Sequence, residues 1–137
     1  MTEADVLGGL LAAEHAAVYA YGGIGARLDE RRRVAALAAY DAHRVLRDSL
    51  LARMRARGLA TPGPALAYAL PPGSPVQQAI AVETDLSARW RDLVGSTDSA
   101  DLRALAVRAL ADAAVRASRW RQASGQHPLT DPWPGQT

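Results

Sequence analysis

The chain has 137 residues, the size of a single domain, and 49% of them are hydrophobic while only 5% are aromatic. This composition favours closely packed helices over a sheet-rich core. The absence of cysteine excludes disulfide scaffolds, thiolate metal sites and cysteine nucleophiles. The net charge of +2 is too small to indicate a nucleic-acid partner by itself.

The first apolar stretch of the chain predicts an amphipathic helix over residues 3–27. Thr2 and Asp5 have the spacing of a capping box at its start, and Glu14 lies at the centre of its apolar face. An unpaired buried carboxylate is costly, so we expect a cation, a proton, a metal or a hydrogen-bond network to face Glu14. The neighbouring His15 points about 100° away and is expected at the edge of the helix interface.

The same stretch is not expected to cross a membrane. Residues 7–26 have about the length of a membrane span, but Glu14 and His15 interrupt the centre. The acidic N-terminus lacks the basic flank of a signal peptide. We therefore expect a cytoplasmic protein with no membrane partner.

A second helix is predicted over residues 30–57, from Asp29 to a C-terminal cap at Gly58. Its apolar face predicts that His43 points inward. Residues 58–73 contain four prolines and cannot be one helix, yet they are too apolar for a loose linker. They predict an extended crossover that packs across the bundle and links two helical hairpins.

The third helix is predicted over residues 75–94. Ser74 is its expected N-cap, Gln77 completes a capping box, and Gly95 is the expected stop. Its apolar face carries a second glutamate, Glu83.

The fourth helix is predicted over residues 99–124, with Asp98 as its cap and Arg116 on its inner face. We thus expect a four-helix bundle over residues 1–125 and an extended, proline-rich tail over residues 126–137. Trp133 in this tail is expected to dock on the bundle or on a neighbouring subunit.

Each predicted hairpin carries a glutamate on the inner face of its first helix. Glu14 and His43 are 29 residues apart, and so are Glu83 and Asp112. Ferritin-like di-iron proteins supply one glutamate from each of two helices and a Glu-x-x-His pair from each of the other two. Here Tyr40 stands where that pair would have its glutamate, and the fourth helix has no histidine. Half of the ligand pattern is therefore missing.

Several segments, in order, resemble the actinobacterial ferritin-like domain family of unknown function. They are LLAAEHAAVYAYG, AYDAHRVLRDSL, AYALP, AVETD, RASRWR and PWPG. The resemblance implies an all-α, ferritin-like four-helix bundle and no established substrate. It transfers candidate metal positions only to Glu14, His43 and Glu83.

Three functions remain open from the sequence. The first is a non-catalytic bundle that acts by self-association or by binding a ligand or partner. The second is an oxidoreductase of the di-iron or di-manganese type, with candidate ligands Glu14, His43, Glu83 and Asp112. The third is an arginine-rich module that binds nucleic acid or an acidic partner. We favour the first, with no cofactor and no catalytic residue, and expect no nucleic-acid partner.

In this interpretation a buried polar network replaces the metal site, and its members are Glu14, Tyr40, His43, Glu83 and Arg116. We expect the Arg116 guanidinium to fill part of the space of a metal and to bond at least one of the two glutamates. The alanine-rich helix faces and Trp133 leave apolar surface, which predicts a homodimer. Nothing in the sequence identifies a small-molecule ligand.

Overall fold

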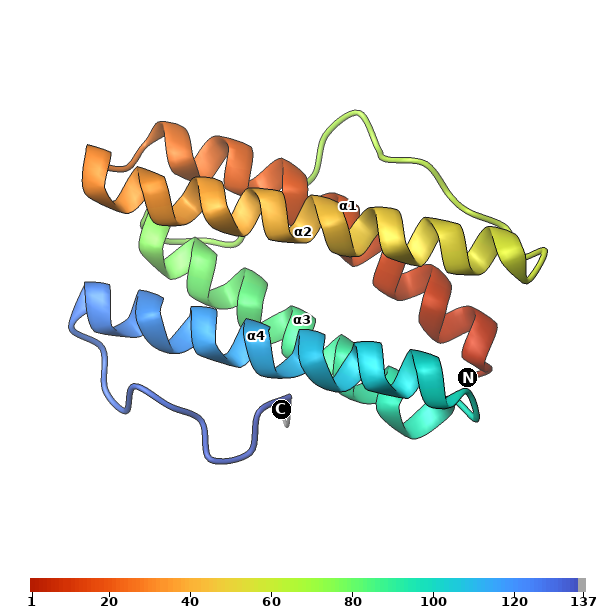
Figure 1. The fold of residues 1–137 in the computed structure, drawn as a ribbon. Coiled ribbons are helices and arrows are strands. Elements are labelled where there is room, and N and C mark those ends of the chain that lie inside the picture. Colours follow the sequence, from red (N-terminus) through yellow and green to blue (C-terminus); the bar gives the residue numbers. More distant parts are fainter. Residues whose placement is uncertain (136–137) are drawn as a thin grey trace.

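The computed structural model describes residues 1–135 and contains four helices (Figure 1). They are α1 (Glu3–Ala26), α2 (Glu30–Ala56), α3 (Pro75–Ser96) and α4 (Ala100–Ser124). No strand occurs within the described residues. The all-α fold is confirmed, and each helix begins and ends within two residues of its expected bounds.

Side-chain caps fix where most helices begin. Thr2 and Asp5 form the expected capping box of α1, Asp29 caps α2, and Ser74 with Gln77 caps α3. Glycines in the left-handed region follow α2 and α4, where Gly58 has φ +68° and Gly125 has φ +71°. These conformations suit glycine because it has no Cβ to clash.

Two of the expected boundary residues were wrong, the cap of α4 and the stop of α3. The cap of α4 is Ser99, whose hydroxyl accepts from the backbone N–H of Leu102, and not Asp98. Helix α3 continues through Gly95 to Ser96, because the backbone turns extended only at Thr97. A glycine inside a helix costs only about 1 kcal/mol relative to alanine, so Gly95 by itself does not end α3.

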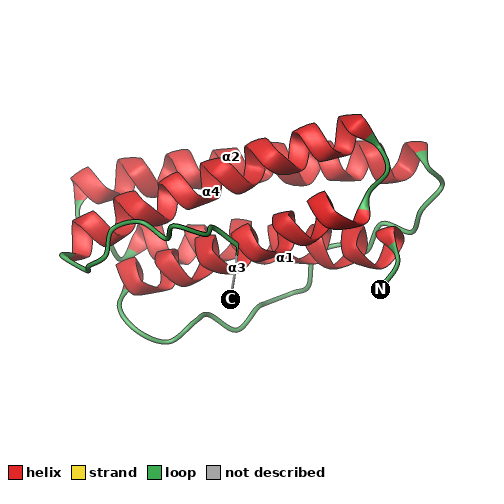
Figure 2. Cartoon of the chain, turned by 90° about the horizontal axis from the view of Figure 1, so that it is seen from below, coloured by secondary structure: helices red, strands yellow, loops and turns green. Residues whose placement is uncertain are grey.

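The four helices form two hairpins that pack in two layers. Helices α1 and α2 form one hairpin, α3 and α4 form the other, and the crossover returns along the length of the bundle (Figure 1). Consequently α3 runs antiparallel to α1. Seen from below, α2 and α4 lie in one layer and α1 and α3 in the other (Figure 2). Extensive contacts join α1 to α2, α3 to α4, and α1 to α3, whereas α2 and α4 contact each other far less.

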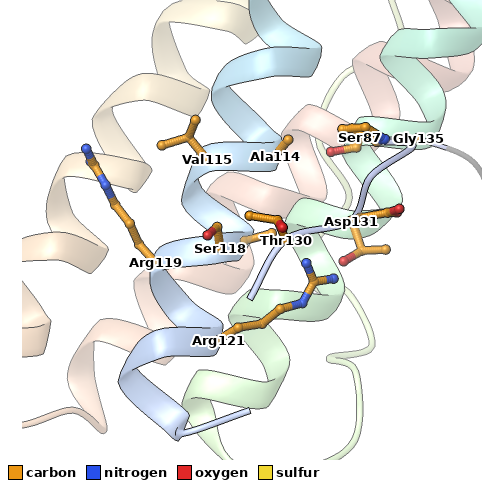
Figure 3. Close-up of a pocket in the computed structure, with 12 residues that line it drawn as sticks. Ser87, Ala114, Val115, Ser118, Arg119, Arg121, Thr130, Asp131 and Gly135 are labelled. Carbon is orange, nitrogen blue, oxygen red and sulfur yellow. The ribbon is translucent and has the colours of Figure 1, made fainter. Parts of the chain in front are cut away.

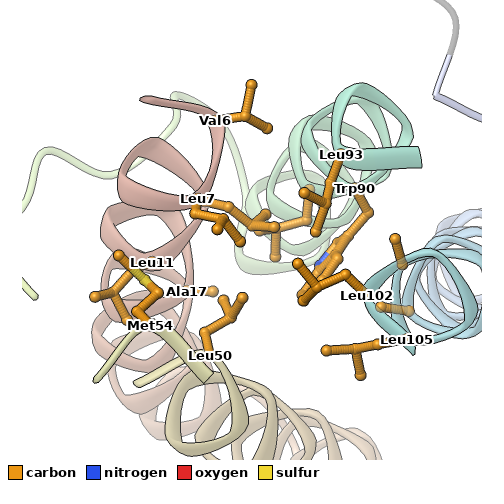
Figure 4. Close-up of a cluster of buried hydrophobic side chains, with 14 residues drawn as sticks. Val6, Leu7, Leu11, Ala17, Leu50, Met54, Trp90, Leu93, Leu102 and Leu105 are labelled. Atoms are coloured by element: carbon orange, nitrogen blue, oxygen red, sulfur yellow. The ribbon is translucent and has the colours of Figure 1, made fainter. Parts of the chain in front are cut away.

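The core has two apolar clusters with a polar layer between them. The first cluster, shown in Figure 4, fills the end of the bundle where α1 begins, and includes Leu7, Leu50, Trp90 and Leu102. The second fills the opposite end and includes Tyr21, Ile24, Ala36, Ala79 and Trp120. Glu14, His43 and Glu83 are buried in the layer that separates the clusters.

The crossover packs on the bundle at both of its ends. Leu59 packs against the first apolar cluster. The Tyr68 ring lies 5.5 Å from that of Tyr19, and the Pro71 carbonyl accepts from the Gln78 side chain at 2.7 Å. Leu66, in the middle of the crossover, is fully exposed, so the expected packing was wrong for this residue and not for the crossover as a whole.

The tail lies along α4 and approaches α3 through its backbone rather than through its tryptophan. A Cβ on Gly135 would lie 2.7 Å from the Ser87 carbonyl oxygen, so only glycine allows this approach. The side chain of Trp133 is 70% exposed and does not dock on its own bundle. Among the residues that the structure describes, no helix has an apolar stretch long enough to span a membrane.

Candidate functional site

The centre of the polar layer is a histidine held between two carboxylates. His43 of α2 places Nδ1 2.7 Å from Glu14 Oε2 and Nε2 3.0 Å from Glu83 Oε2. All three side chains are completely buried. An ionised carboxylate only accepts hydrogen bonds, so both ring nitrogens must donate, and the imidazole must carry two protons.

The electrostatics agree with an imidazolium at this position. Burial disfavours the charged ring, but the hydrogen bonds and negative charges of Glu14 and Glu83 outweigh it. Together they raise the pKa of His43 to about 9. Burial likewise opposes ionisation of Glu83, yet His43 and Arg116 lower the pKa of this carboxyl below its usual value. The centre therefore holds charges rather than neutral groups near pH 7.

Aromatic side chains supply the remaining donors. The Tyr21 hydroxyl donates to Glu83 Oε2 at 2.5 Å, and Trp90 Nε1 donates to Glu14 Oε1 at 3.0 Å. Trp120 Nε1 in turn donates to the Tyr21 hydroxyl at 3.1 Å. Burial and the nearby Glu83 charge raise the pKa of Tyr21 well above its usual value, so this hydroxyl keeps its proton.

The bonds from Tyr21 to Glu83 and from Trp90 to Glu14 connect the two hairpins, and each hairpin donates one of them. Tyr21 follows Glu14 by seven residues on α1, and Trp90 follows Glu83 by seven residues on α3. Seven residues are about two helical turns, so each aromatic residue lies on the same face as the glutamate of its own helix. Because the two helices run antiparallel, each aromatic residue reaches the glutamate of the other helix.

Arg116 completes the charge balance from α4. Its Nε donates to Glu83 Oε1 at 3.0 Å, as expected for a charge-assisted bond to one glutamate. Its side chain is 17% exposed, and its Nη2 is buried without a hydrogen-bond partner among the described residues. Two carboxylates thus face two cations, and the network has no net charge.

The structure does not bring all of the candidate residues into this network. Tyr40 is half-buried, lies 5.6 Å from the guanidinium carbon of Arg44, and makes no hydrogen bond to the network. Asp112 is exposed on α4 and lies outside the polar layer. His15, expected at an edge, is buried, and burial lowers its pKa. In the described part of the chain, no group of three or more His, Asp or Glu side chains is arranged to hold a metal ion.

The sequence did not predict the partners of Tyr21, Trp90 and Trp120 in the polar network. The available signal was spacing: Tyr21 and Trp90 each follow a buried glutamate by seven residues, and Trp120 follows Arg116 by four. Residues at these spacings share a helix face, and buried indole and phenol groups need polar partners.

A separate hollow lies between α4 and the tail (Figure 3). It measures about 340 Å³, and its polar lining includes Ser118, Arg121 and Asp131. None of the residues of the polar network lines it. This hollow is therefore a surface feature, distinct from the buried centre.

Comparison with known proteins places the chain in a family. The family described as "Domain of unknown function (DUF4439)" matches residues 7–137. The crystal structure of a conserved hypothetical protein, rv2844, from Mycobacterium tuberculosis is similar, with 33% sequence identity and a TM-score of 0.87. The similarity covers 96% of each chain. No curated protein matches the sequence. The chain therefore belongs to the DUF4439 family, a family of domains of unknown function.

Proposed function

We propose that this protein is a non-catalytic, ferritin-like bundle in which an internal ion network replaces the metal centre, and that it acts by binding a ligand or partner. The observation that carries this proposal is the position of His43 between Glu14 and Glu83. In a di-iron bundle, glutamates on facing helices converge on metal ions at the centre. Here an imidazolium lies between the two glutamates.

The donor set is a poor fit to a pair of metal ions. Both nitrogens of His43 are engaged by carboxylates, so neither has a free lone pair for a metal. Helix α4 contributes the cation Arg116 to Glu83 rather than a ligand. A fixed positive charge beside the carboxylates disfavours a second cation by repulsion. In our proposal, binding therefore takes place on the surface of the bundle.

Self-association is one form that this binding takes in our proposal. Val34 and Val45 of α2 are each 68% exposed, and their spacing of eleven residues, about three turns, puts them on one face. Trp133 adds a large exposed aromatic ring on the tail. A second copy of the chain would cover such apolar surface, so we propose a homodimer. Light scattering of the full chain tests this, and a monomer at high micromolar concentration would contradict it.

Metal analysis tests the central proposal. The full chain is expressed with added iron and manganese, purified without chelator, and analysed by mass spectrometry for metals. We expect no stoichiometric iron or manganese. The matched variants are Glu83→Gln, which alters the network, and Asp85→Asn, which alters an exposed carboxylate on the same helix.

Stoichiometric metal in the native chain and in Asp85→Asn, but not in Glu83→Gln, would overturn the proposal. That result would favour the alternative, an oxidoreductase of the di-iron or di-manganese type with a reduced ligand set.

A further inference from the structure

A groove between α2 and α4 has Arg116 in its lining. It measures about 340 Å³, and Trp120 and alanines of both helices supply its apolar lining. It exists because α2 and α4, unlike the other neighbouring helices, make few contacts with each other. Figure 1 views the molecule from this side, with α2 and α4 in front. The volume lies at the lower end of the range for small-molecule sites.

The groove is positively charged, and no acidic residue lines it. Four arginines contribute to its lining: Arg31, Arg32, Arg116 and Arg119. Arg32 is already engaged, because it donates to the Ala123 carbonyl at 2.8 Å and lies 3.8 Å from Asp29. Within residues 1–135, Arg31 and Arg119 make no ion pair or side-chain hydrogen bond. Three guanidinium groups therefore have donors left for a ligand.

Arg116 distinguishes this groove from an ordinary basic surface. Its Nε is fixed by Glu83, so the guanidinium is held in one position before any ligand arrives. Its Nη2 is buried and has no partner in the described chain. A buried donor without an acceptor is destabilising, and an anion in the groove would satisfy it.

We propose that this groove binds a small organic anion, with a carboxylate or phosphate head on the arginines and an apolar body on Trp120 and the alanines. Arg116 would donate from Nη2 to the head, and Arg119 and Arg31 would neutralise its charge. Trp120 offers only its ring, since its Nε1 is engaged by Tyr21. This inference rests on the proposed ligand-binding function and names the class of ligand.

Calorimetric titration of the full chain tests the proposal with four probes. Benzoate and phenyl phosphate carry the two heads on one apolar body, benzyl alcohol lacks the charge, and inorganic phosphate lacks the body. We expect saturable one-to-one binding of benzoate or phenyl phosphate, weakened by added salt. The tighter of the two identifies the head. We expect benzyl alcohol and inorganic phosphate to bind at least about tenfold more weakly, because each lacks one set of contacts.

Three arginine variants locate the site. Arg119→Ala should weaken binding by about tenfold or more, the usual effect of losing one charged hydrogen bond. Arg116→Lys keeps a cation for Glu83 but leaves no second nitrogen for the groove, and it should weaken binding similarly. Arg108→Ala removes an exposed arginine from α4 outside the groove and should leave the affinity unchanged.

The proposal is wrong if neither organic anion binds, if benzyl alcohol or inorganic phosphate binds equally well, or if Arg108→Ala matches the effect of Arg119→Ala. Native affinity in Arg116→Lys would also overturn it. Metal content is measured on the same preparation. Metal-free protein without anion binding contradicts only this inference, whereas stoichiometric metal contradicts the proposed function independently.

Discussion

Raising the pH from 6.5 to 9 is expected to destabilise the fold through His43. Its pKa is 6.5 when unperturbed and about 9 in the folded chain. Below pH 6.5 both states hold the proton, and the network contributes its full stabilisation. As the pH rises through about 9, the folded state loses the proton and the contribution disappears. At about 1.4 kcal/mol for each pKa unit, the change in the free energy of unfolding is about 3 kcal/mol.

Between pH 6.5 and 9, His43 is the member of the network whose protonation is expected to change. Glu14 and Tyr21 of α1, Glu83 of α3 and, behind it, Arg116 of α4 are the charged or titratable groups of the network. The lowered pKa of Glu83 affects stability only below pH 4.5, where stability falls as the pH falls. The raised pKa of Tyr21 affects stability only above pH 10.

Urea unfolding followed by circular dichroism measures the effect at several pH values between 6 and 9. The matched variants are His43→Gln, which removes the titrating ring, and His127→Gln, which changes an exposed histidine of the tail. We expect the native chain and His127→Gln to lose stability with rising pH, and His43→Gln to lose little. A flat native profile, or an equal slope in His43→Gln, would refute the imidazolium assignment.

Substitutions in the ion pair, at Trp90 and at the cap of α4 give further tests by urea unfolding. Arg116→Leu leaves Glu83 without its cation and should lower the free energy of unfolding by about 3–5 kcal/mol. Glu83→Gln in the same chain should recover part of this loss. An unchanged midpoint in Arg116→Leu would contradict the ion pair. Trp90→Phe removes a buried donor to a carboxylate and should cost about 1–3 kcal/mol, and no loss would argue against that bond. Ser99→Ala should cost about 1 kcal/mol and Asp98→Ala little, and the reverse order would make Asp98 the cap after all.

The helices and the inward direction of the key side chains could be predicted from the sequence. Both follow from local rules, because caps mark the ends of a helix and the 3.6-residue period determines which side chains share a face. Glu14, Glu83 and Arg116 each lie on an apolar stripe, so their inward direction was predictable. The choice between Asp98 and Ser99 was not, since adjacent residues with similar capping preference cannot be separated by spacing alone.

The composition of the network could not be predicted in full, because it depends on how helices are staggered. Tyr40 precedes His43 by three residues and thus points about 60° away from it, which leaves it at the edge of the interface. Trp90 reaches Glu14 only because of the axial offset between α1 and α3, and no local pattern encodes that offset. The groove has the same origin, since the separation of α2 from α4 is a property of the assembled bundle.

The residues joined by each hydrogen bond of the network are separated by different lengths of chain. These separations indicate the order in which the bonds form during folding. Two bonds lie within hairpins, His43 to Glu14 over 29 residues and Arg116 to Glu83 over 33. The others join the hairpins across 40, 62, 76 and 99 residues. Shorter loops cost less entropy to close, so each acid can meet a base of its own hairpin first.

Each hairpin would then carry an internally compensated pair before the two halves meet, and docking need not desolvate a lone charge. Bonds between the hairpins form last in this order. Loss of the Trp90 indole donor should consequently accelerate unfolding more than it slows folding, because in this order its contact forms only after the hairpins have docked.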